Sequence, residues 1–331
     1  MLVTRTPLRL SLCGGGTDLP SVYRKWGGLV VGGAVSLSSY LTVRPLPPFH
    51  PFKSRIVYSE IELVTDHRDI KHGAVAACLA HTGTEDGVEV FHQSDIPSRS
   101  GTGSSSTFVV GLLNALYAKK GMQKPPEIIA EEAIHIEQVV LRENVGCQDQ
   151  IFAAMNSSPA EIRFHRDGTF TFCPLVLSPA HLQDLESHLL MFFTGISRDS
   201  TQVASSYYGK LEETPDRHFA MVRLAEVCSR AIREGDYERM GAAIEESWRL
   251  KAGLSKEVTN SRLSQLLVKA RLMGAWGGKV MGAGGGGCIV VVAPPVKREE
   301  VIRTLVQDGC VHLPFSFSEM GSHVVYQRRC L

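Results

Sequence analysis

Three consecutive serines follow a Gly-Thr-Gly turn in the stretch IPSRSGTGSSSTF (96–108). This stretch separates a β-rich run, VEVFHQ, from a strongly apolar run that predicts a helix. A helix N-terminus offers unpaired N–H groups and a partial positive charge, which suit a phosphate. Gly101 and Gly103 let the backbone approach a ligand closely, and the serine hydroxyls can bond a phosphate or Mg²⁺. A plain serine N-cap is the simpler interpretation, but it needs one serine rather than three.

A second glycine-rich stretch, GAGGGG (282–287), formally matches the dinucleotide-binding pattern Gly-x-Gly-x-x-Gly. The apolar strand CIVVVAP follows it where a dinucleotide-binding fold requires a helix, so we reject that match. The chain also contains no Gly-x-x-x-x-Gly-Lys-Ser/Thr sequence, which disfavours a P-loop fold. Five glycines in six residues nonetheless carry a large cost in chain entropy, which argues against an ordinary loop.

Two further segments place an aspartate after a glycine turn. In TPLRLSLCGGGTDLP (6–20), Arg9 alternates with apolar neighbours on a predicted strand, and Asp18 follows three glycines and a threonine. Asp149 follows a glycine in VGCQDQ. The ordinary interpretation is that each aspartate lies on the protein surface. The functional interpretation is that it binds the hydroxyl groups of a polar ligand.

Short strands and helices alternate in the first half of the chain, and helices dominate the second half. The run AEIRFHRDGTFTFCPL predicts a hairpin that turns at Asp167-Gly168, and we expect a domain boundary near Val176. Two strands, PFSFSE and HVVYQRR, should end the chain. Helices are predicted for residues 106–120, 127–142, 217–233, 237–250, 261–273 and 297–307. The class is therefore mixed α and β in two lobes.

Composition narrows the range of partners. With 331 residues and 44% hydrophobic content, the chain can form two domains with buried cores, and its net charge of +1 gives no reason to expect nucleic acid or an anionic membrane. No apolar run approaches the roughly 18 residues of a membrane span, and the first residues do not resemble a secretory signal. Eight cysteines without a Cys-x-x-Cys pair indicate reduced thiols in a cytoplasmic protein.

Together, and in this order, three of these stretches resemble the motifs of a superfamily of small-molecule kinases, that of galactokinase, homoserine kinase, mevalonate kinase and phosphomevalonate kinase. The segments are PLRLSLCGGGTDLP, PSRSGTGSSSTF and KVMGAGGGGC, and they span Pro7 to Cys288. The resemblance implies an α+β fold with an ATP-binding N-terminal lobe over residues 1–176, like the second domain of ribosomal protein S5. A ferredoxin-like C-terminal lobe would cover residues 177–331, with the active site between the lobes.

The resemblance also assigns roles to single residues. Asp149 matches the catalytic aspartate, and Arg9 matches the cation beside it, which would stabilise charge on the transferred group. Mg²⁺ would be held by Ser105 and Glu137, although Glu132 has similar helix neighbours and periodicity does not choose between the two acids. The residues expected to bind ATP are Pro97, Ser100, Gly101, Thr102, Gly103, Ser104, Ser105, Ser106, Gly282, Gly284 and Gly285.

Other segments, including VGCQDQIFAA and EESWRLKAGLS, resemble the sugar 1-kinases that act on heptose phosphates, with a fucokinase-like branch nearby. This resemblance implies phosphorylation of the C1 hydroxyl of a heptose 7-phosphate to a 1,7-bisphosphate, a precursor of nucleotide-activated heptose for surface polysaccharide. Galactokinases carry a glutamate where this chain has Gly15, which argues against galactose. A second phosphate on the substrate needs a cationic anchor, and Arg198 and Lys251 are the candidates. The alternative is that each of them is a solvated cation on the protein surface. The residues expected to bind substrate are Gly15, Gly16, Thr17, Asp18, Gly146, Arg198, Lys251 and Gly284.

Four alternatives remain at this point: a nucleotide-linked oxidoreductase, a catalytically silent small-molecule sensor, a fucokinase-like enzyme, and an isoprenoid-pathway kinase or decarboxylase. The strand after GAGGGG counts against the first, and intact Arg9, Ser105 and Asp149 count against the second. The segments GGGTDLP and VGCQDQ favour a sugar over an isoprenoid precursor. We expect the protein to bind a sugar phosphate and to bind neither nucleic acid nor a membrane. The sequence leaves open whether the protein forms a homodimer.

Overall fold

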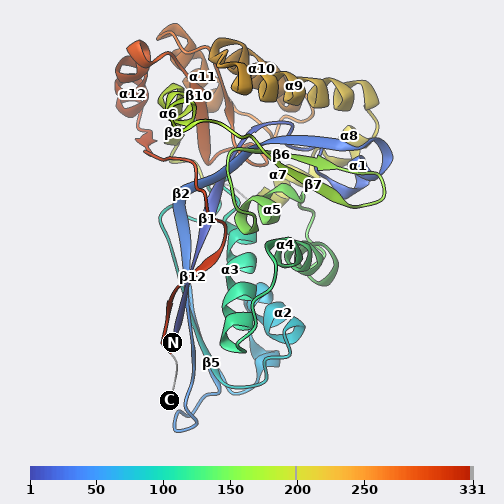
Figure 1. Cartoon of the computed structure of the whole chain (residues 1–331), viewed down its shortest axis with the longest axis vertical. Helices are drawn as coiled ribbons and strands as arrows, with labels where there is room; N and C mark the ends of the chain where they lie inside the picture. Colours follow the sequence, from blue (N-terminus) through green and yellow to red (C-terminus); the bar gives the residue numbers. More distant parts are fainter. Residues whose placement is uncertain (198–199, 329–331) are drawn as a thin grey trace.

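A computed structural model describes residues 1–197 and 200–328, which form two lobes stacked along the long axis of the molecule (Figure 1). The first lobe is built on two long antiparallel strands, β1 (Leu2–Cys13) and β2 (Gly28–Pro45). Alternate side chains of β1 point to opposite faces of the sheet, so Leu8, Leu10 and Leu12 share one face and Arg9 lies on the other. All four are buried, because both faces of β1 are covered at this end.

The first sheet has the strand order β12-β1-β2-β5-β3-β4, and the β6–β7 hairpin joins it through β2. Most neighbours are antiparallel, and β3 runs parallel to β5. The remaining strands of this sheet are β3 (Ser54–Val57), β4 (Ile61–Val64), β5 (Val88–Ser94), β6 (Ala160–Phe164), β7 (Phe170–Pro174) and β12 (His323–Gln327).

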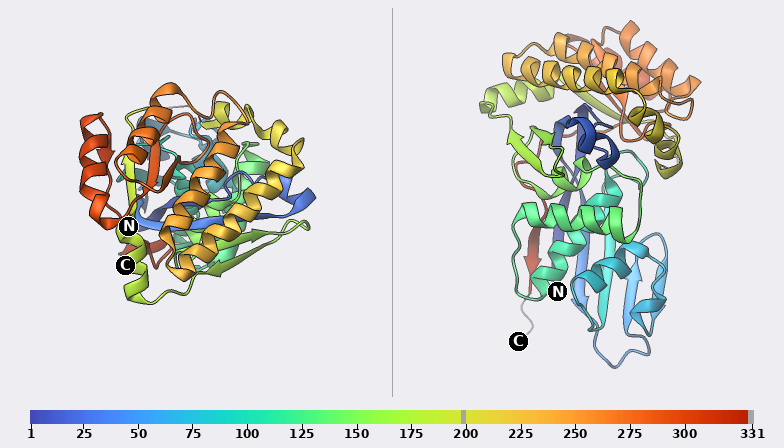
Figure 2. Two further views of the ribbon diagram at one scale, coloured as in Figure 1. Left: turned by 90° about the horizontal axis from the view of Figure 1, so that it is seen from above. Right: turned by 90° about the vertical axis from the view of Figure 1, so that its right-hand side faces the viewer.

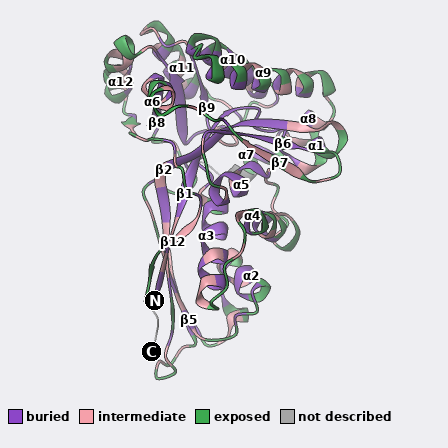
Figure 3. Ribbon diagram, in the orientation of Figure 1, coloured by how far each residue is buried: buried purple, intermediate pink, exposed green. Residues whose placement is uncertain are grey.

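One face of this sheet is covered by helices, as two perpendicular views show (Figure 2). The central helix is α3 (Ser104–Lys119), which is buried along most of its length (Figure 3) and contributes Phe108, Leu112 and Leu116 to the core. Its apolar residues lie on nearly every side, which is typical of a helix enclosed by other elements. Its neighbours are α2 (Gly73–His81), α4 (Pro126–His135) and α5 (Gln148–Ala154).

The second lobe packs helices on an antiparallel sheet of order β11-β8-β10-β9. Its strands are β8 (Leu189–Phe193), β9 (Gly277–Val280), β10 (Cys288–Val292) and β11 (Val311–His312). Its helices are α6 (Pro179–His188), α7 (Ser200–Ser205), α8 (Tyr208–Glu212), α9 (Pro215–Glu234), α10 (Tyr237–Ala252), α11 (Ser261–Leu272) and α12 (Arg298–Gln307). In the part of the chain that is described, no helix has the length and apolar content that crossing a membrane requires.

The two lobes share a hydrophobic core. Leu8, Leu10 and Leu12 of β1 belong to the same buried cluster as Ile232 of α9 and Ile244 of α10. Burial of apolar side chains contributes about 1.5–3 kcal/mol for each large residue. This shared cluster therefore fixes the end of β1, and with it Arg9, against the second lobe.

The α+β class and the two-lobed architecture are confirmed, with three local differences from prediction. The hairpin over 160–174 is present, but the helix predicted to reach Arg142 stops at His135 and continues as a π-helical turn, Ile136–Val140. Within the predicted strand PFSFSE, Phe317 makes only one isolated bridge, to Val35. The domain boundary expected near Val176 lies just after β7. The last strand, β12, belongs in sequence to the second domain but pairs with β1 of the first lobe.

Candidate active site

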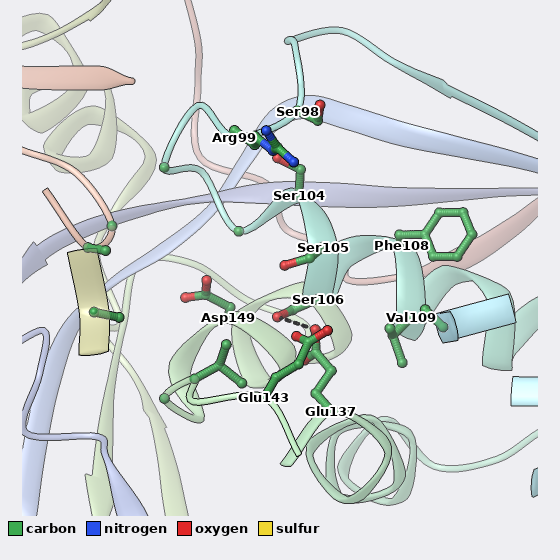
Figure 4. A pocket seen from close by; sticks show the side chains of 18 of the residues that line it. Ser98, Arg99, Ser104, Ser105, Ser106, Phe108, Val109, Glu137, Glu143 and Asp149 are labelled. Atoms are coloured by element: carbon green, nitrogen blue, oxygen red, sulfur yellow. Dashed lines mark hydrogen bonds between the residues drawn. The ribbon is translucent and has the colours of Figure 1, made fainter. Parts of the chain in front are cut away.

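A cavity of about 890 Å³ lies where the lobes meet, and residues from both lobes line it. The first lobe contributes the end of β5, the loop before α3, the π-helical turn and the start of α5. The second lobe contributes Tyr207, Tyr208, Lys251 and the start of the glycine-rich loop at Gly282. Figure 4 shows the serines at the start of α3 and the acidic side chains of this cavity.

Arg9 and Asp149 form a two-point ion pair in the wall of the cavity. Arg9 Nε donates to Asp149 Oδ1 at 2.7 Å, and Nη2 donates to Oδ2 at 2.9 Å. The arginine side chain is 3% exposed and the aspartate 24%, so the carboxylate faces the cavity while its cationic partner lies behind it. Arg9 also donates from Nη1 to the carbonyl oxygen of Gly101. One buried guanidinium thus holds both Asp149 and the glycine-rich loop in fixed positions.

The loop before α3 approaches this pair closely. Gly103 is the residue before α3 and has φ 79°, a left-handed conformation that glycine adopts readily. A Cβ at Gly103 would lie 3.1 Å from Asp149 Oδ2. The N–H groups at the start of α3 therefore lie close to the aspartate, where a phosphate chain could be bound at the helix N-terminus.

The three serines have different surroundings. Ser105 is exposed and lines the cavity, and Figure 4 shows its hydroxyl on the same side as Asp149. Ser106 is buried, and its hydroxyl donates to Glu137 Oε1 at 3.1 Å. The structure thus brings Glu137 to Ser106 by a direct hydrogen bond, and Ser105 presents its hydroxyl to the cavity.

Glu137 is a buried acid, 1% exposed, that the π-helical turn directs toward the serines. Burial raises the pKa of this carboxyl to about 8, against the lowering effect of hydrogen bonds from Gln150 and Ser106. The neighbouring carboxylates of Glu143 and Asp149 raise it further. Gln150 Oε1, beside it, is buried and has no hydrogen-bond partner among the described residues. An acid desolvated in this way, next to hydroxyl and amide oxygens, is a suitable donor set for Mg²⁺.

The structure also separates Glu137 from the other candidate acid. Glu132 accepts a hydrogen bond from Tyr117 Oη at 2.7 Å and lies 3.5 Å from His81 Nε2. It does not line the cavity, whereas Glu137 does.

Asp18 joins its own stretch, residues 6–20, to the segment that carries Asp149. Its Oδ1 accepts from Gly16 N at 2.8 Å, and its Oδ2 accepts from the backbone N of Gln148 at 3.2 Å and from Gln148 Nε2 at 3.1 Å. A Cβ at Gly146 would lie only 1.9 Å from Asp18 Oδ2, so this position requires glycine. Asp18 therefore positions the segment that carries Asp149, and it lines the cavity itself.

Several predicted contacts lie behind the cavity wall. The Thr17 hydroxyl donates within the protein, to the carbonyl oxygens of Gly14 and Leu29, and the hydroxyls of Ser100 and Thr102 bond each other at 2.7 Å. The structure uses these groups to support the loops that form the wall. The predicted site residues that do not line the cavity are Gly15, Thr17, Ser100, Thr102, Gly284 and Gly285.

The second lobe closes the cavity through Lys251 and its neighbours. Lys251 is 7% exposed, donates to the carbonyl oxygen of Gly282 at 2.8 Å and lies 5.3 Å from the centre of the Tyr207 ring. Tyr208 Oη donates to the carbonyl oxygen of Asn144 at 2.5 Å, and burial raises the pKa of this tyrosine. Arg198, the other candidate for a phosphate anchor, lies outside the described residues.

The GAGGGG stretch (282–287) packs directly on the loop before α3. The backbone N of Cys288 donates to the carbonyl oxygen of Ser100 at 2.7 Å, and a Cβ at Gly287 would lie 2.2 Å from the same oxygen. Gly287 has φ 80°, which a residue with a side chain rarely adopts. These contacts fix the loop before α3, in the first lobe, against the sheet of the second lobe.

A flat apolar region at the far end of the cavity has no counterpart in the sequence analysis. The His72 ring stacks on Phe108 with centroids 4.8 Å apart, and Tyr58 packs edge-on against His72 at 4.7 Å. Burial lowers the pKa of His72 and lowers that of His92 to about 4, so both rings are neutral near pH 7. These residues come from separate elements without a local motif, and no sequence signal points to them. Their neutral flat rings suit stacking against a nucleobase.

Known proteins resemble this chain over its whole length. Residues 69–157 match the model for the N-terminal domain of GHMP kinases, and residues 228–311 match the model for their C-terminal domain. The D-glycero-alpha-D-manno-heptose 7-phosphate kinase of Campylobacter jejuni is 27% identical, over 96% of this chain and 97% of that protein. A mevalonate kinase of Pyrococcus furiosus is 28% identical, over 60% of this chain and 57% of that enzyme. The crystal structure of a D-glycero-D-manno-heptose 1-phosphate kinase from Bacteroides thetaiotaomicron superposes with a TM-score of 0.80 at 23% identity, covering 99% of this chain and 100% of that one.

Proposed function

The chain belongs to the GHMP kinase family, whose members are ATP-dependent phosphotransferases, and we propose that it phosphorylates the anomeric hydroxyl of a heptose 7-phosphate. The observation that carries the proposal is the two-point Arg9–Asp149 pair beside the start of α3, at the junction of the lobes. It places a carboxylate and a cation where an acceptor hydroxyl and a terminal phosphate would meet. The heptose relative aligned over nearly the full chain supports the substrate class.

Nucleotide binding would use both ends of the cavity. The adenine base would lie against His72, Phe108 and Tyr58, and the phosphates would follow the loop of residues 97–103 to the start of α3. Backbone N–H groups at the helix start bind phosphate oxygens without requiring a positively charged protein surface. This agrees with a chain whose net charge is only +1.

The chemical step transfers the terminal phosphoryl group from ATP to the sugar. The C1 oxygen forms a bond to phosphorus as the bond from phosphorus to the bridging oxygen of ADP breaks. Asp149 accepts a hydrogen bond from the C1 hydroxyl, orients its oxygen and receives its proton. Arg9, fixed by two hydrogen bonds, holds that carboxylate in place and stabilises negative charge on the transferring group.

Mg²⁺ would be held by Glu137 and by the hydroxyl of Ser105, which faces the cavity. Ser106 would orient Glu137 through its hydrogen bond rather than bind the metal. When bound, the ion neutralises charge on the phosphate oxygens. Burial is the main cause that raises the pKa of Glu137, and a cation bound at this carboxylate would lower it.

The sugar would lie against Asp18, Gln148 and Tyr208, and its second phosphate would need a cation from the second lobe. Lys251 is the described candidate and Arg198 the other. Because Lys251 already donates to Gly282, a sugar without a second phosphate, as for a fucokinase-like 1-kinase, is the second candidate substrate. ATP and a soluble sugar phosphate as substrates imply a cytoplasmic location. A homodimer is tested directly by light scattering after size-exclusion chromatography.

The test is a coupled ADP-release assay with heptose 7-phosphate, heptose, sedoheptulose 7-phosphate, mannose, fucose and mevalonate. We expect Mg²⁺-dependent turnover to be fastest with heptose 7-phosphate, and phosphorus NMR to show a new phosphate on C1. Turnover with fucose alone would establish the second candidate. Turnover with mevalonate alone would refute a sugar substrate.

A further inference from the structure

Three lysine or arginine side chains line the cavity, and they differ in how they are used by the protein. Arg9 is bonded to Asp149 and to Gly101, and Lys251 donates to Gly282. Arg99 also lines the cavity, yet it has no hydrogen bond or ion pair with any residue in 1–197 or 200–328. Its side chain is exposed, and Figure 4 places it over the start of α3, beside Ser104.

The backbone of Arg99 adopts a conformation that arginine normally avoids. Its φ is 62°, in the left-handed region where glycine is favoured and other residues are uncommon. A non-glycine residue held there is typical of sites where strain serves a function. No protein group in the described residues engages the guanidinium, so it is free to bind a ligand in the cavity that it lines.

The position of Arg99 on the loop identifies the kind of partner. Four residues later, Gly103 lies so close to Asp149 that an added Cβ would be 3.1 Å from Oδ2. The loop therefore passes from Arg99 to the point where a phosphoryl group would be transferred. A guanidinium that projects from such a loop can bind two phosphate oxygens at once.

We propose that the Arg99 side chain binds the terminal phosphates of the nucleoside triphosphate. Arg99 would then be a second cation at these phosphates, in addition to Arg9. This inference rests on the proposed kinase function, because it assumes that a triphosphate lies along residues 97–103. The exposed side chain lies over the start of α3, where it can reach a ligand in the cavity.

The test compares Arg99→Gly with Arg142→Gly. Arg142 is a matched control: it is exposed, has φ 55°, lacks a described partner and does not line the cavity. Glycine relieves the left-handed strain in both variants, so neither should unfold at a lower temperature than the wild type. Isothermal titration with ATP, ADP and AMP, each with Mg²⁺, measures the contribution of each phosphate.

We expect Arg99→Gly to weaken ATP and ADP binding about 10-fold and to leave AMP binding within about 2-fold, as loss of a charge-assisted contact predicts. Arg99→Lys should recover part of the loss, and Arg142→Gly should bind all three nucleotides as the wild type does. Unchanged ATP affinity in Arg99→Gly, with a wild type that binds ATP, would overturn the inference and leave the kinase proposal intact. Equal weakening of AMP and ATP would overturn the assignment to terminal phosphates. A wild type that binds no ATP would refute the proposed function and this inference together.

Discussion

The buried carboxyl of Glu137 should make the stability of the protein depend on pH, and Glu137→Gln should remove that dependence. The side chain is 1% exposed, and burial is the largest cause that raises its pKa, from an ordinary value of 4.5 to about 8. The folded protein therefore holds this proton more tightly than the unfolded chain does. Its contribution to stability is full below pH 4.5 and is lost progressively as pH rises to about 8.

The size of the effect follows from the shift in pKa. Each unit corresponds to about 1.36 kcal/mol, so the complete penalty for ionising Glu137 in the metal-free protein is at most about 5 kcal/mol. Between about pH 5.5 and pH 8, this linkage predicts a loss of about 3 kcal/mol in the free energy of unfolding. Glutamine keeps the side-chain volume and can still accept from Ser106, but it cannot ionise.

The assay is urea denaturation at about pH 5.5 and pH 8, with and without Mg²⁺. Without metal, the advantage of Glu137→Gln over the wild type should grow by about 3 kcal/mol between the two pH values. Mg²⁺ should stabilise the wild type at the higher pH by about 1–3 kcal/mol and should stabilise the variant far less. Glu131→Gln is the control, because Glu131 is exposed on the neighbouring helix α4.

Two results would refute this reasoning. If wild type and Glu137→Gln showed the same pH dependence, the carboxyl would not be the group that titrates. If Mg²⁺ stabilised both proteins equally at the higher pH, Glu137 would not be a metal ligand.

Four other substitutions test the remaining parts of the site. Asp149→Asn should lower turnover by about 100-fold to 10,000-fold while ATP affinity measured by titration stays within about 3-fold, and near-normal turnover would exclude the catalytic role. Ser105→Ala should raise the Mg²⁺ concentration needed for half-maximal activity, whereas Ser106→Ala should chiefly alter the pH dependence through Glu137; equal effects of the two variants would contradict separate roles. Gly287→Ala should cost about 2–4 kcal/mol in urea denaturation, since its Cβ would lie 2.2 Å from the carbonyl oxygen of Ser100 and its φ is 80°, and an unchanged midpoint would refute that packing argument.

Sequence alone supported the residues that lie in contiguous motifs. Arg9 and Asp18 lie in one motif, and Asp149 lies 131 residues after Asp18 in another, yet the structure brings all three to one cavity wall. The extents of α9, α10 and α11 and the β6–β7 hairpin also follow from periodicity and turn residues, because these signals are local. Residue-level roles at this wall remain predictions for the variants above to test.

Other features depend on interactions that no local pattern encodes. Helical periodicity could not separate Glu132 from Glu137, because Glu137 lies in a π-helical turn, which changes the angle between successive side chains. The ring cluster of Tyr58, His72 and Phe108 joins three elements that meet only in the folded chain. Pairing of β12 with β1 likewise joins opposite ends of the sequence, which a boundary drawn near Val176 does not anticipate.

The glycine-rich stretches act in this fold through close approach more than through flexibility. At Gly146 a Cβ would lie 1.9 Å from Asp18 Oδ2, and at Gly287 it would lie 2.2 Å from the carbonyl oxygen of Ser100. Each contact joins two loops that carry predicted site residues: Gly146 packs against a short buried side chain, and Gly287 packs against backbone. Catalysis by positioning requires such rigidity, because an error of about 1 Å in the placement of reacting groups can cost about 100-fold in rate. We therefore expect the glycines behind the cavity wall to matter as much as those that line it. They set the distances between the loop of residues 97–103, the segment that carries Asp149 and the second lobe.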